Sequence, residues 1–323
     1  MRHLLAIEDL DRDEIERIME RADSFAEVGR RDIKKVPTLR GRTIVSLFYE
    51  SSTRTSASFE LAAKRLSADL VSIKAAGSSV DKGESLKDTI ATLSAYEPEA
   101  IVIRSPFAGA AKLVAGWTEA GVVNAGDGKH EHPSQALLDV YTLRDRLGDL
   151  EGKAIWIVGD VLHSRVARSC ALAFRLMGAQ VTLCGPPSLI PRGAAAALDC
   201  AVTHDIAGLG DADVVYALRM QNERMAESFV PSIREYAIRY QVDGRRLGAR
   251  QLLMHPGPVN RGVELSGDVI DGPNSLITQQ VKSGLVVRMA ILYELLAGSD
   301  RPRGQRDGDD GELTAPTPIG EPA

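Results

Sequence analysis

The hydrophobic and polar positions of the chain form two recurring patterns, one at helical spacing and one in short apolar runs. In the segment 11–30, apolar residues recur at helical spacing behind Asp11 and Glu14, which predicts an amphipathic helix that begins with a capping box. Short runs rich in β-branched and aromatic residues follow and predict strands at 43–49, 70–73, 100–104 and 122–125. Helix-spaced segments separate these runs, so we expect a parallel sheet covered by helices on both faces.

The same alternation begins again after the glycine-containing break at 148–152. Further apolar runs predict strands at 154–158, 181–184, 213–218 and 252–255. The pattern therefore predicts an α/β protein with two domains, each a mainly parallel sheet with helices on both faces. We place the first domain at residues 1–134 and the second at residues 135–274.

The C-terminal part of the chain divides into a predicted helix and a predicted tail. One apolar stripe at helical spacing is formed by Leu276, Ile277, Val281, Leu285, Val286, Met289, Leu292 and Leu296. A long amphipathic helix over 275–298 is therefore expected, and we expect it to pack back on the first domain. From residue 299 onward, large apolar residues are nearly absent, so 299–323 is predicted to be a disordered tail with no catalytic role.

Composition and charge exclude several classes of protein. The chain has 323 residues, of which 44% are apolar, enough for two hydrophobic cores of ordinary size. A net charge of -5 gives no basic field for nucleic acid, and no segment approaches a membrane helix of about 20 apolar residues or a secretory signal. Three irregularly spaced cysteines suit buried thiols in a reducing compartment, namely Cys170, Cys184 and Cys200. We expect a cytoplasmic protein with no nucleic-acid or membrane partner.

A run of hydroxyl-bearing residues with one arginine, at 48–56, joins the first predicted strand to the next helix. A helix N-terminus offers unpaired N–H donors and partial positive charge, and Arg54 adds a planar fork that matches phosphate oxygens. The run therefore predicts a phosphate site; the alternative is a simple Ser/Thr cap with Arg54 on the surface. It lacks the spacing of a P-loop, and Gly159-Asp160 lacks the Gly-x-Gly-x-x-Gly fingerprint of a nicotinamide site.

Three further polar side chains follow predicted strands of the first sheet. Arg104 ends the strand at 100–104, and His132 and Gln135 follow the strand at 122–125. Open α/β sheets bind ligands at the carboxyl ends of their strands, so these side chains and residues 52–55 are expected to meet in one crevice. Taken alone, His132 would be interpreted as a loop or core histidine.

Together these motifs resemble the aspartate and ornithine carbamoyltransferases, over about residues 2–296. The matching motifs are Ser52-Thr53-Arg54-Thr55, Lys82-Gly83-Glu84, Arg104 and His132-Pro133-Ser134-Gln135. The resemblance implies that carbamoyl phosphate is a substrate whose phosphate is held by Ser52, Thr53, Arg54 and Thr55. It also implies that Thr55, Arg104 and His132 polarise the carbamoyl oxygen and that Gln135 helps to orient the carbamoyl amine.

The implied reaction needs an oxyanion site. Attack by an amine places negative charge on the carbonyl oxygen, and each donor already aimed there lowers the barrier by about 3 to 4 kcal/mol in comparable sites. His132 would act as a donor, the departing phosphate could take the proton, and domain closure would bring the amine to the carbonyl. The expected catalytic residues are Arg54, Thr55, Lys82, Arg104 and His132, with no metal and no other cofactor.

Two arginines of the second domain favour one amine acceptor. Arg165 follows the strand at 154–158 and Arg219 follows the strand at 213–218. Either arginine alone would be interpreted as a helix cap or a surface charge, but two guanidiniums suit a dicarboxylate. The resemblance implies that aspartate is bound by Lys82, Arg165, Arg219 and Gln221. The expected reaction converts L-aspartate to N-carbamoyl-L-aspartate with release of phosphate, a step of de novo pyrimidine biosynthesis.

The segment His255-Pro256-Gly257-Pro258 helps to separate the branches of the family. The ornithine branch usually has a His-Cys-Leu-Pro segment and a Ser-Met-Gly loop, and neither occurs here. Some relatives have Leu-Pro in place of Gly257-Pro258, whereas the form found here resembles a bacterial aspartate branch. The resemblance implies a cis bond before Pro258, with the carbonyl of Gly257 in contact with the carbamoyl amine. A carbamoyltransferase for ornithine or another amino acid is the alternative.

The polar segment 77–84 predicts a mobile loop. In the aspartate branch the matching loop enters the active site of a neighbouring subunit, so the resemblance implies a homotrimer in which Ser78 and Lys82 complete shared sites. Further assembly with dihydroorotase or regulatory chains stays open. A non-catalytic homologue that scaffolds a pyrimidine-synthesis assembly is a second alternative, but it predicts loss of the substrate contacts, and the residues expected to make them are all present.

Overall fold

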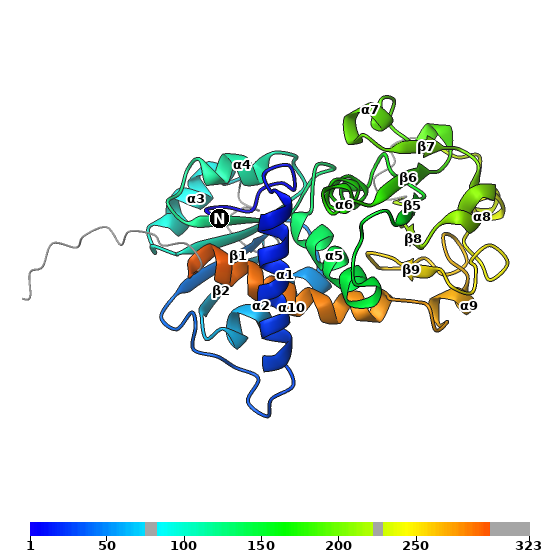
Figure 1. Ribbon diagram of the computed structural model, residues 1–323. Helices are drawn as coiled ribbons and strands as arrows, with labels where there is room; N and C mark the ends of the chain where they lie inside the picture. The colour runs from blue at the N-terminus through cyan, green and yellow to red at the C-terminus, as the bar shows by residue number, and fades with distance from the viewer. Residues whose placement is uncertain (75–82, 222–228, 298–323) are drawn as a thin grey trace, which may run out of the picture.

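The structure is a computed structural model that describes residues 1–74, 83–221 and 229–297, and it has two parallel-sheet domains beside each other (Figure 1). The sheet of the first domain has the strand order β2-β1-β3-β4, and every neighbouring pair is parallel. Its elements are α1 (Arg12–Val28), β1 (Thr43–Phe48), α2 (Thr53–Arg65), β2 (Asp69–Lys74), α3 (Leu86–Ser94), β3 (Ala100–Ser105), α4 (Ala110–Ala115), β4 (Gly121–Asp127) and α5 (Pro133–Leu147).

The sheet of the second domain has the order β7-β6-β5-β8-β9 and is also parallel throughout. Helix α5 crosses the boundary expected after residue 134 and leads into this domain. The remaining elements are β5 (Ala154–Val158), α6 (Arg165–Leu176), β6 (Gln180–Cys184), α7 (Ala194–Leu198), β7 (Ala201–Thr203), β8 (Val214–Ala217), α8 (Ile233–Tyr240), β9 (Leu252–Met254), α9 (Gly267–Ile270) and α10 (Ile277–Leu296), with two short 3-10 helices at Pro187–Leu189 and Ile206–Asp211.

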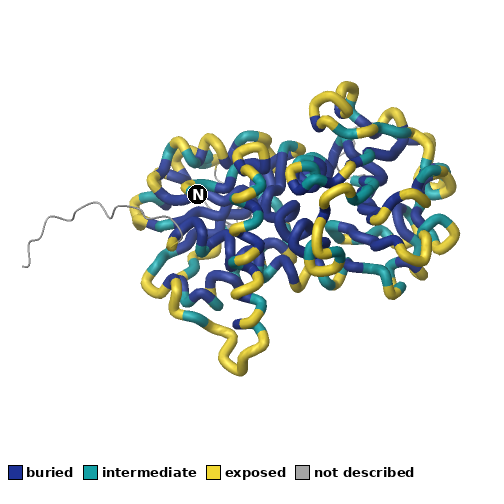
Figure 2. The backbone as a smooth tube through the Cα atoms, in the orientation of Figure 1, coloured by how far each residue is buried: buried dark blue, intermediate teal, exposed yellow. Residues whose placement is uncertain are grey.

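The central strands of both sheets are covered on both faces, and successive residues of a strand point to opposite faces. In β1, Ile44 faces the core formed with α1, α2, α5 and α10, whereas Val45 faces a second core formed with α3 and α4. In β5, Ile157 joins the first of these cores, whereas Val158 packs in a third core with α8 and α9. The first core is thus continuous between the domains, and the two sheets are joined by packing as well as by the chain. Figure 2 shows buried segments in both domains.

The two long helices predicted at the ends of the chain are both present. Helix α1 begins with the expected capping box, in which the Glu14 N–H donates to Asp11 at 2.8 Å and the Asp11 N–H donates to Glu14 at 3.3 Å. Helix α10 packs against α1, α2 and α5 (Figure 1). The single apolar stripe expected for α10 is wrong, because Val281 is 57% exposed and the part from Val287 to Leu296 is buried on most sides by those three helices.

Other expectations concern smaller features. Cys170 and Cys184 are buried thiols, whereas Cys200 is only half-buried. Among the helices of the described residues, none has both the length and the apolar character that spanning a bilayer requires. The tail predicted at 299–323 lies outside the described residues.

Candidate active site

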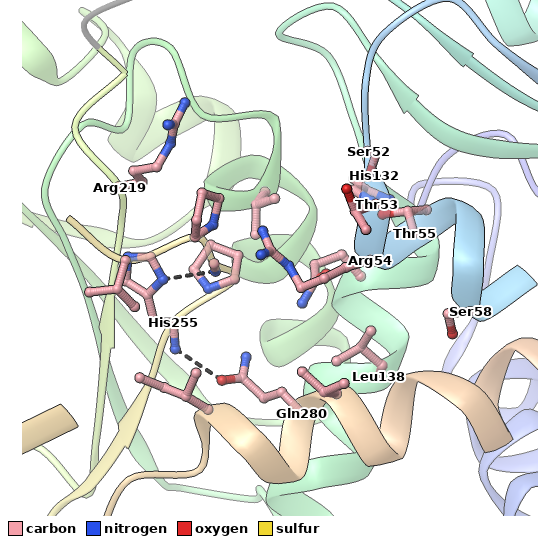
Figure 3. Close-up of a pocket in the computed structure, with 18 of the residues that line it drawn as sticks. Ser52, Thr53, Arg54, Thr55, Ser58, His132, Leu138, Arg219, His255 and Gln280 are labelled. Atoms are coloured by element: carbon pink, nitrogen blue, oxygen red, sulfur yellow. Dashed lines mark hydrogen bonds between the residues drawn. The ribbon is translucent and has the colours of Figure 1, made fainter. Parts of the chain in front are cut away.

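The candidate site lies where both sheets reverse their strand order. In the first sheet the chain passes from β1 to β2 on one side and then to β3 on the other; in the second sheet it passes from β5 to β6 and β7 and then returns to β8. Such a reversal opens a crevice at the carboxyl ends of the two central strands, because their following loops turn in opposite directions. Residues at the ends of β1, β3, β5 and β8 accordingly line one cleft of about 1090 Å³ between the domains (Figure 3).

The N-terminus of α2 forms one wall of this cleft. All four hydroxyl and arginine residues expected to bind phosphate line it, namely Ser52, Thr53, Arg54 and Thr55 (Figure 3). Ser52 occupies the N-cap position, but its side chain makes no capping hydrogen bond. The first N–H groups of a helix have no partner within the helix, so this end presents donors and partial positive charge to the cleft. The geometry favours the phosphate site over a simple helix cap.

Arg54 reaches across the cleft toward the turn that contains Gly257 (Figure 3). Gly257 has a φ of +65°, and a Cβ atom there would lie 3.0 Å from Cζ of Arg54. Partial burial and the charge of Arg219 lower the pKa of Arg54, which still carries its charge at neutral pH. The peptide bond between Gly257 and Pro258 is cis, as the family resemblance implied.

His132 is buried at the N-cap position of α5. Its backbone N–H donates to Oγ of Ser169 at 2.8 Å, and Oγ of Ser134 lies 3.4 Å from its Nδ1. Burial lowers the pKa of His132 well below its usual value, and the charges of neighbouring arginines lower it further. The imidazole is therefore neutral near pH 7, and donation from Ser134 to Nδ1 would leave the N–H on Nε2.

Glu50 connects the two domains within the cleft, a role that was not predicted from the sequence. Its Oε2 lies 2.5 Å from a terminal nitrogen of Arg165, at the start of α6, and 3.3 Å from Nε of Arg104, in β3. The same Arg165 guanidinium donates to the backbone carbonyl of Gly128 at 3.1 Å. The signal in the sequence is an acidic residue two positions after β1, within the run at 48–56, but its partners lie far away along the chain.

The aspartate-binding residues expected in the second domain lie at the ends of its two central strands. Arg165, Arg219 and Gln221 all line the cleft, and Figure 3 shows Arg219 across the cleft from Ser52 and Thr53. The Gln221 N–H donates to Oδ2 of Asp160 at 3.3 Å, which ties the loop after β8 to the loop after β5. The structure thus brings every described residue of the expected site to one cleft. Ser78 and Lys82 lie outside the described residues.

Gln135 and the turn at 255–258 also line this cleft. The side-chain amide of Gln135 donates to Asp139 one helical turn further along α5. The ring nitrogen Nδ1 of His255 accepts a hydrogen bond from the Gly257 N–H at 2.8 Å (Figure 3). The backbone N–H of His255 donates to the side-chain oxygen of Gln280, in α10, at 3.0 Å. Residues from α5, from the turn after β9 and from α10 are therefore linked behind the cleft.

Two family models match the chain and together cover nearly all of its described part. The carbamoyl-P binding domain of aspartate/ornithine carbamoyltransferase matches residues 2–145, and the Asp/Orn binding domain of the same family matches residues 151–295.

Relatives with assigned names agree with these models. The aspartate carbamoyltransferase catalytic subunit of Salinispora tropica is 55% identical over 307 residues, which cover 93% of this chain and all of the relative. The protein of the same name from Mycobacterium tuberculosis is 52% identical, covering 92% of this chain and 96% of the relative.

Solved structures show the same fold. The catalytic subunit of M. jannaschii aspartate transcarbamoylase is 34% identical, with a TM-score of 0.81 over 93% of this chain and 100% of that one. Aspartate transcarbamoylase from Trypanosoma cruzi, in complex with N-(phosphonacetyl)-L-aspartic acid, is 30% identical, with a TM-score of 0.81 over 92% of this chain and 96% of that one.

Proposed function

Because the chain belongs to the aspartate/ornithine carbamoyltransferase family, we propose that its cleft transfers the carbamoyl group of carbamoyl phosphate to the amine of L-aspartate. The observation that carries this proposal is the meeting of three groups in one cleft. These are the N-terminus of α2 with Arg54, the half-buried Arg104 with the buried His132, and the two arginines of the second domain, Arg165 and Arg219.

Carbamoyl phosphate binds first in this proposal, with its phosphate at the N-terminus of α2. Backbone N–H groups and the hydroxyls of Ser52, Thr53 and Thr55 donate to phosphate oxygens, and Arg54 supplies a charged fork. The cleft position of all four side chains supports this placement.

The carbamoyl oxygen lies at Thr55, Arg104 and His132. When the amine attacks, negative charge develops on this oxygen, and donors held in place beforehand stabilise it without reorganisation. The lowered pKa of His132 supports a role as a neutral N–H donor, because an imidazolium is disfavoured among arginines in a buried position.

Aspartate binds with its carboxylates at Arg165 and Arg219, and Gln221 lies beside them. Its unprotonated amine attacks the carbamoyl carbon, a C–N bond forms, and the bond from that carbon to the phosphate oxygen breaks. The released phosphate takes the proton that the amine nitrogen loses, so N-carbamoyl-L-aspartate and phosphate are the products. This sequence requires positioning and charge stabilisation from the protein but no protein base.

We also propose that the chain works as a cytoplasmic homotrimer in which Ser78 and Lys82 act on a neighbouring subunit's cleft. Two features of the first domain support a subunit contact there: β2 is an edge strand, and the apolar side chains of Val71 in β2 and Leu61 in α2 are 45% and 43% exposed. Mixing a Lys82→Ala protein with a His132→Ala protein tests the shared site. Mixed trimers should regain part of the activity, and no regain would argue against sharing.

The test of the acceptor is steady-state carbamoyl transfer by the purified protein, with L-aspartate and L-ornithine compared at equal concentrations. Activity with aspartate and none with ornithine is expected, since ornithine carries a cationic side chain where the cleft presents Arg165 and Arg219. Transfer to ornithine would overturn the acceptor, and inactivity with both would favour a non-catalytic homologue.

A further inference from the structure

Asp139 of α5 is a fully buried carboxylate that accepts hydrogen bonds from four side chains. Gln135 of the same helix donates to both of its oxygens at 3.1 and 3.2 Å. Gln280 of α10 donates to Oδ1 at 2.7 Å, and Tyr216 of β8 and Cys170 of α6 donate to Oδ2 at 2.7 and 3.4 Å. One carboxylate therefore connects four elements directly behind the cleft.

A carboxylate can only accept hydrogen bonds, so it decides which way each bound amide faces. Gln135 must turn its NH₂ group toward Asp139, and its carbonyl oxygen Oε1 is then the polar atom left for the cleft that Gln135 lines. Without Asp139, the two ends of this amide would be nearly equivalent in shape. The carboxylate thus makes Gln135 an acceptor toward the substrate.

The same carboxylate sets the direction of a second chain of hydrogen bonds. The NH₂ group of Gln280 donates to Asp139, so the side-chain oxygen of Gln280 is left to accept the backbone N–H of His255, at 3.0 Å. The next link is the Gly257 N–H, which donates to Nδ1 of His255 at 2.8 Å (Figure 3). The backbone N–H groups of His255 and Gly257 already donate to Gln280 and to the His255 ring. The polar backbone groups that the turn can present to the cleft are therefore its carbonyl oxygens.

The carbamoyl group differs from its simplest analogue in needing such acceptors. Its NH₂ carries two N–H donors, whereas the methyl group of acetyl phosphate has the same size and carries none. A site that turns oxygens toward this position binds the amine well, and a site that turns N–H groups there leaves donors facing donors.

We infer that Asp139 is a positioning residue that gives the cleft its preference for carbamoyl phosphate over acetyl phosphate, by turning the acceptor oxygens of Gln135 and of the turn at 255–258 toward the carbamoyl amine. Asp139 itself does not line the cleft and acts only through these groups. The inference rests on the role proposed for Gln135 in orienting the carbamoyl amine.

The test compares three ligands by calorimetry in the absence of aspartate: carbamoyl phosphate, acetyl phosphate and inorganic phosphate. Asp139→Leu keeps the branched shape of the side chain but removes both acceptor oxygens, so neither glutamine amide is held with its NH₂ group toward position 139 and the Gln135 amide can rotate. We expect carbamoyl phosphate to bind about 10- to 100-fold more weakly to this variant. The affinities for acetyl phosphate and inorganic phosphate should change less than about threefold.

Matched controls separate positioning from general damage. Asp145→Leu makes the same substitution at an exposed position of the same helix and should leave all three affinities unchanged. Tyr216→Phe removes a buried donor to Asp139 without rotating either amide, so it should lower the melting temperature but keep the preference for carbamoyl phosphate. An equal loss for all three ligands in Asp139→Leu would overturn the inference, because it would mark Asp139 as a support of the whole site.

Two more variants test the inference when the Asp139 variant does not fold, and they separate it from the role proposed for Gln135. If Asp139→Leu does not fold, Gln280→Met breaks only the chain of hydrogen bonds to the turn, and it should lower the preference for carbamoyl phosphate by a smaller factor. An unchanged preference would contradict the inference. Gln135→Ala tests the proposal beneath it. A selective loss of carbamoyl phosphate binding in Gln135→Ala together with an unchanged preference in Asp139→Leu would refute the role of Asp139 alone. No selective loss in Gln135→Ala would refute both.

Discussion

Single side chains in this cleft owe their charge state to burial and to their neighbours. His132 illustrates the effect, since its surroundings exclude water and contain the charges of Arg104, Arg165 and Arg288. A neutral donor results, and it can face a developing oxyanion without first losing a proton. Asp139, which lies behind the cleft, shows the opposite shift: burial raises the pKa of this acid to about 6, although several side chains donate hydrogen bonds to it.

The lowered pKa of His132 predicts a specific dependence of stability on pH. In the unfolded chain a histidine takes up a proton near pH 6.5, whereas His132 in the folded protein does not. As the pH falls below about 6.5, the unfolded state binds more protons than the native state, so stability is lost on the acidic side. We expect the melting temperature of His132→Gln to fall less between pH 8 and pH 5.5 than that of the wild type. An equal fall in both proteins would contradict a lowered pKa at His132.

Buried His255 should act in the same direction, because burial also lowers its pKa. The His132→Gln variant is therefore expected to reduce the acidic loss of stability without abolishing it.

At the level of elements, the turn after β9 and the start of α2 meet at Gly257 and Arg54. Gly257→Ala would place a Cβ atom 3.0 Å from Cζ of Arg54 and force a non-glycine residue to adopt a φ of +65°. The backbone cost is about 1 to 2 kcal/mol. In addition, displacement of Arg54 should weaken inorganic phosphate binding roughly tenfold, measured by calorimetry.

Gly262→Ala is the matched control for this prediction. Gly262 has a φ of +84°, but a Cβ atom there would meet nothing within 4 Å. This variant should lose similar stability in denaturant titration while its phosphate affinity stays that of the wild type. Equal phosphate affinity in both variants would show that contact with Arg54 is unimportant.

The sequence predicts elements well where an apolar pattern is long and strong. The strand at 154–158 has the expected bounds, and the capping box of α1 is present, because both depend on residues close together in the chain. Strand β7 escapes prediction because it has three residues, lies at the edge of its sheet and is only partly buried. The periodicity of α10 misleads at Val281, because burial there depends on which helices surround α10.

At the scale of the whole molecule, the site residues that the sequence predicts are those that follow strands, since topology brings the ends of parallel strands together. Arg104, His132 and Arg219 belong to this group. Residues whose partners are remote in sequence carry no such signal: Asp139 contacts Tyr216 and Gln280, which lie 77 and 141 positions away. Glu50 does follow a strand, but its partner Arg165 lies 115 positions away, so the contact between them was not predicted.

Glu50 provides a prediction about the two domains acting together. Its carboxylate holds Arg104 of the first domain and Arg165 of the second, and an aspartate carboxylate at Arg165 would share that guanidinium. In Glu50→Ala the two cations lose this common anion, and we expect kcat/KM for aspartate to fall at least tenfold in steady-state assays. Glu60→Ala, which removes an exposed partner of Lys64 in α2, should leave kcat/KM within twofold of the wild type. Similar kcat/KM values for Glu50→Ala and Glu60→Ala would argue against a role for the Glu50 contacts with Arg104 and Arg165 in catalysis.

The central claim, that one cleft binds both substrates across the two domains, is tested most directly by a crystal structure with N-(phosphonacetyl)-L-aspartate. This molecule joins a phosphonate to the two carboxylates of aspartate. We predict that the phosphonate lies at the N-terminus of α2 against Arg54, and that the carboxylates contact Arg165 and Arg219. A phosphonate bound elsewhere, or carboxylates that touch neither arginine, would contradict this assignment of the cleft.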